Sequence, residues 1–299
     1  MVADRPGGIA DPWEGILLID ELRRGRATKP RKTGLTMVID TGLGMGETAD
    51  LLETAADHID IWKLSFGTSV FIPRKVLERK LQLIEKHGID TMPGGTLFEA
   101  AIVQQHCHVY MTRAAELGFT SVEISDGTIA LPAFRRQRTI DCARDAGLTA
   151  ITEVGKKDPK AQPTPEALAK EALQDLAWGA EAVIIEGRES GKSVGVYDAE
   201  GNPDAVAIDT IARLMGDQAA RLIWETPLKP QQAALIARFG LNVGLGNIDP
   251  RGVLALEALR VGLRYETLKP IAERLHRAGR WTPEAIEAAP GESGADGQR

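Results

Sequence analysis

One stretch decides the fold: residues 148–158 read LTAITEVGKKD. A short apolar run is followed at its end by an acid, two bases and a second acid. The same arrangement recurs along the chain, where an apolar segment ends in a charged or Gly-rich cluster and a longer amphipathic segment follows. Such clusters begin at Asp40, Lys63, Glu123, Glu186 and Glu225. This repeated alternation predicts strands that are each followed by a helix.

The pattern predicts eight strands, at residues 34–40, 59–64, 90–92, 121–125, 149–154, 182–186, 221–225 and 241–245. Helical spacing follows each of them, at residues 47–58, 74–87, 96–117, 133–146, 165–178, 205–215, 230–239 and 252–261. Thr96 and Glu99 fit a capping box at the start of the third helix. One extra helix is expected at 271–278. The strands are apolar throughout, which is typical of parallel strands buried on both faces.

Eight such units predict an α/β protein with a single (β/α)8 TIM barrel. A doubly wound open sheet is the alternative. It is disfavoured because Glu47 stands where the third glycine of its phosphate fingerprint belongs. We expect residues 1–33 to form an N-terminal extension, 34–268 the barrel and 269–299 a C-terminal helix and tail. The tail, from Ala285 to Arg299, is expected to be disordered.

The composition of the chain limits the classes of partner that it could bind. The chain has 299 residues, and a net charge of −6 argues against a nucleic-acid partner. No apolar run approaches the ~20 residues that span a bilayer, and no secretory signal is visible, so we expect a cytoplasmic protein without a membrane partner. Cys107 and Cys142 make no disulfide framework and are predicted to be reduced packing residues. We also expect a homo-oligomer.

Active sites of TIM barrels lie at the C-terminal ends of the strands, which we call the mouth. Period-2 alternation predicts which strand-end side chains point inward. On five strands, an apolar residue predicted to fill the barrel is followed two positions later by a polar residue at the mouth. These pairs are Ile61 with Lys63, Ile151 with Glu153, Ile184 with Glu186, Ile223 with Glu225 and Val38 with Asp40. Val243 and Leu245 lead similarly to Asn247. Glu123 is assigned to the same layer, where Ser125 and Asp126 compete for the role.

The mouth is then predicted to hold several carboxylates and several bases. The carboxylates are Asp40, Glu123, Glu153, Glu186 and Glu225, and the bases are Lys63, Lys156, Lys157, Arg188 and Lys192. Crowded carboxylates repel one another unless a cation joins them, and oxygen ligands without His or Cys favour Mg²⁺. The bases suit an anionic substrate. The backbone N–H groups at Gly94, Gly95 and Asn247 could receive a phosphate.

Each of these signals also has a structural interpretation. One charged residue at a strand end is more often solvated or ion-paired than catalytic, and the glycines could simply form turns. Five or more charges facing one mouth favour a site. The five histidines fall on predicted helices or their ends, so a histidine mechanism is not expected.

Residues 28–268 resemble the phosphosulfolactate synthase family. The resemblance rests on ordered segments at 29–31 (KPR), 34–36 (GLT), 60–64 (DIWKL), 66–69 (FGTS), 93–99 (PGGTLFE), 123–127 (EISDG), 153–158 (EVGKKD), 186–192 (EGRESGK), 224–225 (WE), 231–232 (QQ) and 245–248 (LGNI). It implies a Mg²⁺-dependent lyase that adds sulfite to phosphoenolpyruvate. The product would be (2R)-phospho-3-sulfolactate, at the start of coenzyme M or sulfolactate biosynthesis.

On this chemistry, Lys156 is the predicted proton donor, with Lys157 or Lys63 as substitutes, and neighbouring cations are expected to lower its pKa. Glu153 and Glu186 are the first choices as Mg²⁺ ligands, followed by Glu123, Glu225 and Asp40. Arg31, Arg188 and Lys192 are expected to hold the phosphate and sulfonate.

One position departs from the family pattern, because Thr41 follows Asp40 where a lysine is usual. Two alternatives therefore stay open. One is a non-catalytic, stress-associated barrel. The other is a sibling lyase that adds another nucleophile to a phosphorylated enolpyruvate-like acid.

Overall fold

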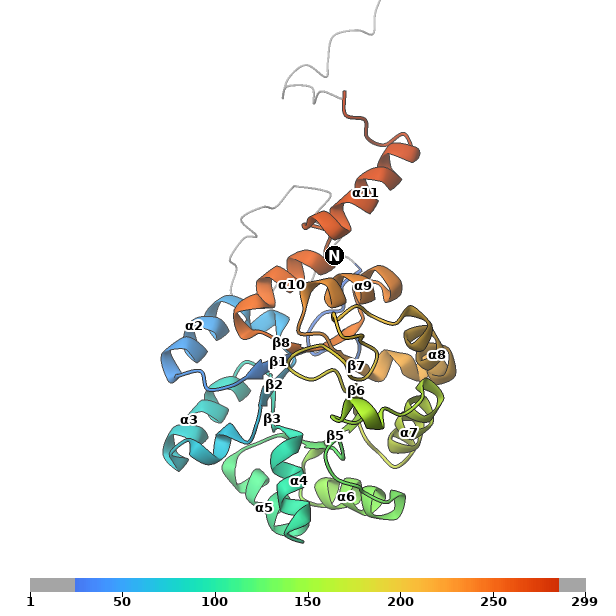
Figure 1. The fold of residues 1–299 in the computed structure, drawn as a ribbon. Helices are drawn as coiled ribbons and strands as arrows, with labels where there is room; N and C mark the ends of the chain where they lie inside the picture. Colours follow the sequence, from blue (N-terminus) through green and yellow to red (C-terminus); the bar gives the residue numbers. More distant parts are fainter. Residues whose placement is uncertain (1–24, 285–299) are drawn as a thin grey trace, which may run out of the picture.

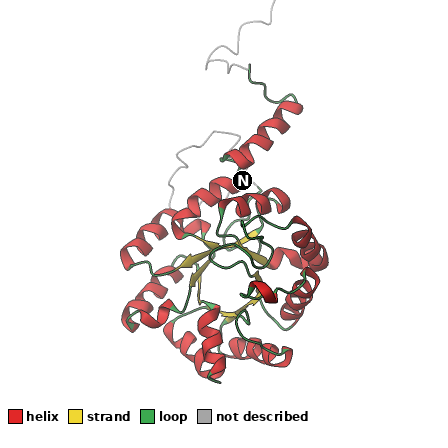
Figure 2. Ribbon diagram, in the orientation of Figure 1, coloured by secondary structure: helices red, strands yellow, loops and turns green. Residues whose placement is uncertain are grey.

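A computed structural model describes residues 25–284 as eight parallel strands inside a ring of helices (Figures 1 and 2). The strands lie in the order β3-β2-β1-β8-β7-β6-β5-β4. β3 and β4 complete a nearly closed barrel, where the Thr120 N–H donates to the Thr91 carbonyl at 3.2 Å. The strand bounds are β1 Thr36–Asp40, β2 Ile61–Leu64, β3 Asp90–Pro93, β4 Ser121–Ile124, β5 Thr149–Val154, β6 Ala182–Ile185, β7 Leu222–Glu225 and β8 Gly244–Ile248. The predicted TIM barrel is confirmed.

The helices follow the strands in sequence. Their bounds are α2 Met45–Ala55, α3 Arg74–Glu85, α4 Gly95–Val103, α5 Cys107–Leu117, α6 Ala133–Asp145, α7 Pro165–Ala177, α8 Ala205–Met215, α9 Lys229–Phe239, α10 Val253–Arg260 and α11 Tyr265–Arg277. No helix among residues 25–284 is long and apolar enough to cross a membrane. The predicted disordered tail lies outside the described residues.

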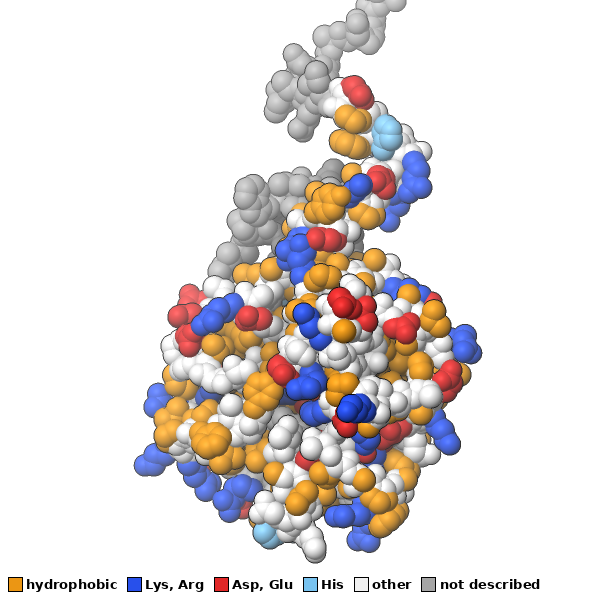
Figure 3. Space-filling model, viewed as in Figure 1, with side chains coloured by type: hydrophobic (Ala, Val, Ile, Leu, Met, Phe, Trp, Pro, Cys, Tyr) orange, Lys and Arg blue, Asp and Glu red, His pale blue; other side chains and the backbone are white. Residues whose placement is uncertain are grey.

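Several predicted boundaries were wrong. The single helix expected at 96–117 is two helices, α4 and α5, separated where Gln105 adopts a φ of 60°. The strand expected at 241–245 is β8, three residues later. The helix expected after Pro270 starts at Tyr265 and keeps Pro270 inside it. α11 extends beyond the ring, with exposed hydrophobic side chains along it (Figures 1 and 3).

The predicted capping box at Thr96 and Glu99 was also wrong. Gly94 is the N-cap of α4, and the buried Glu99 carboxylate instead accepts N–H groups from Thr128 and Ile129. Glu99 therefore ties the start of α4 to the loop that follows β4.

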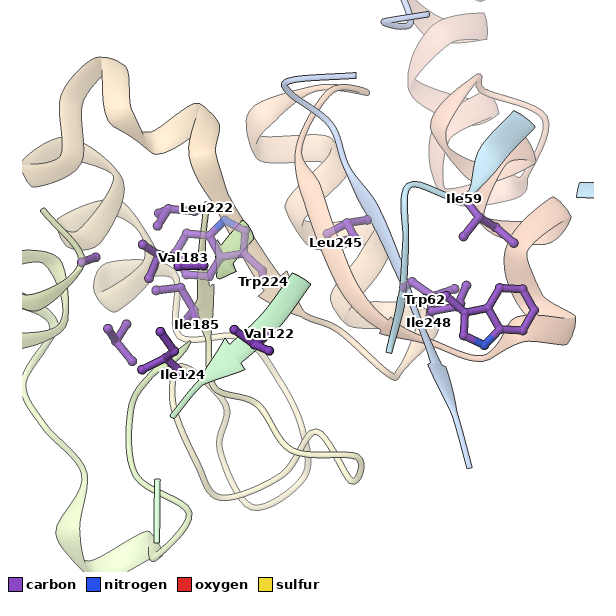
Figure 4. Packing of buried hydrophobic residues seen from close by; sticks show 14 of the residues in the cluster. Ile59, Trp62, Val122, Ile124, Val183, Ile185, Leu222, Trp224, Leu245 and Ile248 are labelled. Carbon is purple, nitrogen blue, oxygen red and sulfur yellow. The ribbon is translucent and has the colours of Figure 1, made fainter. Parts of the chain in front are cut away.

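Each strand separates two hydrophobic layers. The outward side chains pack against the helices, as Figure 4 shows for Trp62, Val122, Ile124, Val183, Ile185, Leu222, Trp224, Leu245 and Ile248. A smaller inner cluster fills the barrel with Met37, Ile61, Met92, Ile151, Ala182, Ile184 and Ile223. Because side chains alternate, a polar residue two positions after an inner residue reaches the mouth. Lys63, Glu153, Glu186 and Glu225 do so, as the alternation predicts.

Strand β1 has the opposite alternation from the one predicted. Met37 points into the barrel and Val38 packs against the helices, so Asp40 also faces the helices. The Asp40 carboxylate accepts bonds from Lys80 Nζ at 2.5 Å and from Trp62 Nε1 at 2.8 Å. Asp40 is therefore corrected from a mouth carboxylate to a partner of Lys80, outside the barrel.

Strand β8 reaches the mouth by an irregularity. Leu245 packs outward, which corrects its predicted inward direction. Thr36 pairs with Leu245 but Val38 pairs with Ile248, so β8 contains one extra residue. Asn247 has a φ of 52° at this bulge, and its side chain turns into the mouth. The predicted place of Asn247 is right, although the alternation behind it was not.

Candidate functional site

A cavity of about 40 Å³ lies at the mouth, lined by residues in or just after all eight strands. It is lined by Ile39, Lys63, Ser65, Phe66, Gly94, Gly95, Thr96, Glu123, Glu153, Lys157, Glu186, Arg188, Glu189, Glu225 and Asn247. A second cavity, of about 110 Å³, lies at the N-terminal ends of the strands, which we call the base. The candidate site is the mouth, because buried charges converge there.

Four buried glutamates and two lysines form what we call the mouth cluster. Lys63 Nζ lies 3.0 Å from Glu123 Oε2 and 2.9 Å from Glu225 Oε1. Lys157 Nζ lies 2.8 Å from Glu153 Oε1 and 2.6 Å from Glu186 Oε2. Each glutamate is at most 2% exposed. Each lysine thus bridges two carboxylates, and four acids share two bases.

This crowding separates the pKa values of the acids. Burial, and then the neighbouring glutamates, raise the pKa of Glu186 well above its usual range. Burial also raises the pKa of Glu123 to about 8, against the opposing charge of Lys63. Burial acts in the same direction on Glu153, but Lys157 and Lys63 outweigh it and hold that pKa below its usual range. The cluster therefore keeps protons that a divalent cation could replace.

The two lysines behave differently from the expectation. Burial alone would lower their pKa values, but the surrounding carboxylates reverse this effect. Glu123 and Glu225 raise the pKa of Lys63 above its usual range, and Glu153 and Glu186 do the same for Lys157. The predicted lowering of a lysine pKa by neighbouring cations is thus wrong for these two, because their nearest charges are acids.

Backbone donors hold three of the carboxylates in place. The Gly95 N–H donates to Glu123 at 3.0 Å, the Gly187 N–H to Glu225 at 3.0 Å and the Arg188 N–H to Glu186 at 2.8 Å. The Gly94 N–H donates to the Leu64 carbonyl. Both glycine N–H groups predicted to receive a phosphate therefore already have protein acceptors.

The donor set fits a divalent cation. Glu153, Glu186 and Glu225 each offer a carboxylate oxygen, and these three atoms lie within 4.8 Å of one another. All three potential ligands are carboxylate oxygens and their charge is negative, which is the kind of site that Mg²⁺ and Ca²⁺ prefer. Glu123 is held apart from this group by Lys63 and Gly95, and Asp40 lies outside the barrel.

Ser125 is a member of the site that the sequence named only as a competitor of Glu123. Its Oγ lies 2.8 Å from Glu153 Oε1 and 3.0 Å from Glu99 Oε1, and it accepts the Gly127 N–H. Ser125 therefore orients Glu153 from the neighbouring strand. Its position two residues after Glu123 is the signal that could have found it.

The two adjacent lysines diverge. Lys157 lines the mouth, whereas Lys156 Nζ donates to the carbonyl and the carboxylate of Asp126, at 2.7 and 2.6 Å. Asp126 in turn meets the buried Arg136, which also donates to the Glu153 carbonyl. Lys156 is thus part of a network beside the mouth, outside its lining.

The predicted anion-binding residues are only partly brought together. Arg188 lines the mouth with a φ of 59°, and Asn247 Nδ2 donates to its carbonyl at 3.2 Å. The buried Asn247 Oδ1 has no hydrogen-bond partner among the described residues. Lys192 is exposed and outside the lining.

Arg31 is a correction, because it lies at the base. Its guanidinium bonds to Asp60 at 2.9 Å and lines the larger cavity there, at the opposite end of the barrel from the mouth. Thr41, the departure from the family pattern, is exposed after β1 and is not among the residues that line the mouth.

Comparison with known proteins gives a consistent result. Residues 24–266 match the family described as (2R)-phospho-3-sulfolactate synthase. The chain is 39% identical over 252 residues to phosphosulfolactate synthase of Methanothermobacter thermautotrophicus, covering 83% of this chain and 96% of the relative. It is 35% identical to phosphosulfolactate synthase of Bacillus subtilis, covering 81% and 95% of the two chains.

More distant matches include a plant relative and a solved structure. HEAT-STRESS-ASSOCIATED 32 of Arabidopsis thaliana is 23% identical, covering 80% of this chain and 90% of the relative. The structure of 3-hexulose-6-phosphate synthase from Salmonella typhimurium superimposes with a TM-score of 0.51 at 15% identity, covering 77% and 98% of the two chains. At that identity the likeness concerns the fold alone.

Proposed function

The chain belongs to the (2R)-phospho-3-sulfolactate synthase family of enzymes, and on that premise we propose that it adds sulfite to phosphoenolpyruvate with the help of Mg²⁺. The product would be (2R)-phospho-3-sulfolactate, and its use in coenzyme M or sulfolactate biosynthesis is part of the proposal. A cytoplasmic location and a homo-oligomeric state stay predictions.

The reaction joins two anions. The sulfite sulfur forms a bond to the CH₂ carbon of phosphoenolpyruvate, and the π electrons of the double bond move toward the carboxylate as an enediolate. A proton then reaches C2, and the phosphate stays attached. The barrier lies in bringing like charges together and in stabilising the enediolate, so the site must supply positive charge and one proton.

Glu153, Glu186 and Glu225 would hold Mg²⁺ in this proposal. The bound cation would supply the positive charge that stabilises the enediolate. Ser125 and the Arg188 N–H keep two of these carboxylates oriented. Glu123 remains paired with Lys63 and the Gly95 N–H beside them.

Lys157 is our proposed proton donor, in place of Lys156. Its ammonium lines the mouth and stays protonated at neutral pH, because Glu153 and Glu186 raise its pKa. Its side chain is 29% exposed, which lets it reach a substrate in the cavity, whereas Lys63 is 6% exposed between two acids. Lys156 is committed to Asp126.

Arg188 is the proposed contact for phosphate or sulfonate, because its guanidinium offers paired N–H donors at the mouth. Asn247 would act by positioning Arg188. The Asn247 amide nitrogen holds the Arg188 carbonyl, and its free Oδ1 can only accept a bond, so it suits water or a protonated group better than a phosphate oxygen.

The mouth cluster is the observation that carries this proposal, since four buried glutamates share only two lysines there. Intact charge pairs also favour an enzyme over a non-catalytic barrel. The test incubates purified protein with phosphoenolpyruvate, sulfite and Mg²⁺ and follows the phosphorus by ³¹P NMR and mass spectrometry. We expect phosphosulfolactate. Folded protein that leaves phosphoenolpyruvate unchanged would overturn the proposal.

A panel of other nucleophiles separates the sibling-lyase alternative. Sulfite should be the preferred nucleophile, and a Thr41→Lys variant should react at a similar rate because Thr41 is outside the mouth lining. Faster reaction with a different nucleophile, or a large gain from Thr41→Lys, would favour the sibling lyase.

A further inference from the structure

The two cysteines meet across neighbouring helices. Cys107 begins α5 and Cys142 lies near the end of α6, and the two helices lie side by side on the outside of the barrel (Figure 1). Cys107 Sγ lies 4.0 Å from Thr139 Oγ1 on α6, and Cys142 Sγ lies 4.0 Å from His108 Nδ1 on α5. The Cys107 thiol is also one of the groups that raise the pKa of Cys142. Both residues are half-buried and reduced.

Both cysteines are free and pack against the hydrophobic core, as predicted. Thr139 is one turn before Cys142, and His108 follows Cys107, so each thiol lies against the segment that carries the other. A disulfide needs facing side chains on closely approaching backbones, and here α5 and α6 pack directly against each other.

We propose that Cys107 and Cys142 form a reversible disulfide that joins α5 to α6, a modification site separate from the mouth. The oxidant is a low-molecular-weight disulfide. One protein thiolate attacks a sulfur of that molecule, which forms a mixed disulfide and releases one small thiol. The second protein thiolate then attacks the mixed disulfide and releases the other small thiol. Two protein thiols are oxidised and one small disulfide is reduced to two thiols.

The surroundings of the pair set its rate. Burial, with Cys107 and then Asp145 adding to it, raises the pKa of Cys142 to about 11. Because the thiolate is the nucleophile, the pair exchanges slowly at neutral pH and stays a dithiol in a reducing compartment. Oxidation is therefore a response to a sustained oxidising change.

The disulfide is expected to stabilise the fold. It would cross-link two helices whose attachment points are well separated in sequence, which restricts the unfolded chain. α6 also carries Arg136, which bonds to Asp175 and to the Glu153 carbonyl. The cross-link therefore fastens a helix that supports the end of β5.

The test treats the folded full-length protein with oxidised glutathione at pH 8.5 and measures mass and thermal unfolding. We expect the loss of two hydrogens per chain without added glutathione, a rise in Tm of about 5 °C, and reversal by dithiothreitol. The Cys107→Ser and Cys142→Ser variants serve as matched controls. Each should carry one glutathione and show no rise in Tm.

Three results would overturn the proposal. One is folded protein whose mass does not change while urea-unfolded protein is oxidised, which would mean that the thiols cannot reach each other in the fold. The second is two bound glutathiones on the wild-type chain. The third is a disulfide between two chains, seen as a dimer on a non-reducing gel.

Discussion

The mouth and the base of the barrel use the same kinds of charged residue in different ways. At the base, Asp60 accepts the Arg31 guanidinium at 2.9 Å and the Thr36 N–H at 2.8 Å. Arg31 also donates to two backbone carbonyls, and Lys29 Nζ donates to the carbonyls of Ala56 and His87. The charges of Asp60, Arg31 and Lys29 are therefore matched by opposite charges or by backbone carbonyls.

At the mouth, carboxylates face carboxylates. Four glutamates share Lys63 and Lys157, and the pKa values of Glu123 and Glu186 are raised because burial and neighbouring acids disfavour their charge. The base fastens the N-terminal segment to the barrel, whereas the mouth is left short of positive charge. A cluster in which like charges remain uncompensated is suited to a ligand, here a cation and anionic substrates.

Two adjacent lysines, Lys156 and Lys157, should differ strongly in their contribution to kcat. If Lys157 delivers the proton, Lys157→Met should lower kcat by about 10² to 10⁴-fold, the usual value of general acid catalysis. Lys156→Met, its matched control, should lower kcat by less than about tenfold, since it removes only the Asp126 contact. Steady-state rates at saturating phosphoenolpyruvate measure both. The reverse order would return the role to Lys156.

Neutralising one carboxylate at each end should change stability unequally. Asp60→Asn leaves Arg31 without its charged partner and should lower the free energy of unfolding by about 3 kcal/mol. Glu186→Gln relieves repulsion with Glu153 and Glu225 and should leave stability unchanged or higher. Urea unfolding at pH 8 without divalent cations compares them. Equal losses in both variants would mean that the two ends do not differ as described.

The mouth should also make stability depend on pH. Folded Glu123 keeps its proton up to about pH 8, whereas the unfolded chain releases it near pH 4.5. The folded state therefore binds more protons between these values, and stability should fall as pH rises through this window. Glu123 alone should lower the free energy of unfolding by at most ~1.4 kcal/mol for each pH unit.

Glu123→Gln should flatten this slope, and Glu116→Gln, at an exposed pair with Arg113, should leave it unchanged. Urea unfolding between pH 5 and 8.5 in the absence of divalent cations measures it. A Glu123→Gln variant as steep as wild type would show that its carboxyl is not the group retaining the proton.

Two asparagines, one at each end of the barrel, should differ in their effect on the KM for phosphoenolpyruvate. Asn247→Gly keeps the left-handed backbone but removes the bond to the Arg188 carbonyl, so the KM for phosphoenolpyruvate should rise about tenfold, the worth of one hydrogen bond. Asn242→Ala at the base removes bonds to Ala27 and Gly25 and should lower stability without changing KM. A KM change in Asn242→Ala alone would contradict this assignment.

The sequence was sufficient for the barrel because its repeating strand and helix signals need no tertiary information. Alternation also located Lys63, Glu153, Glu186 and Glu225, since each follows a recognisable inner residue by two positions. The same rule failed on β1, where every residue before Asp40 except Thr36 is apolar and either alternation fits. Only packing decided that Val38 faces the helices.

Other errors come from backbone that breaks the alternation. Gly155 has a φ of 123°, and a side chain there would lie 2.7 Å from Glu186 Cβ, so the directions of Lys156 and Lys157 cannot be counted from Glu153. The bulge at Asn247 has the same effect on β8. Arg31 lies only five residues before β1 begins, so its place at the N-terminal ends of the strands could have been predicted from the sequence.

The mouth cluster should bind a divalent cation, because its four glutamates outnumber its two lysines. Thermal unfolding with MgCl₂, compared with NaCl of equal ionic strength, measures this binding. We expect Mg²⁺ to raise the Tm of the wild-type protein, because a ligand of the folded state stabilises it. The rise should disappear in Glu186→Gln and Glu225→Gln but persist in Glu116→Gln. An equal rise in all four proteins, or none in the wild type, would contradict this expectation.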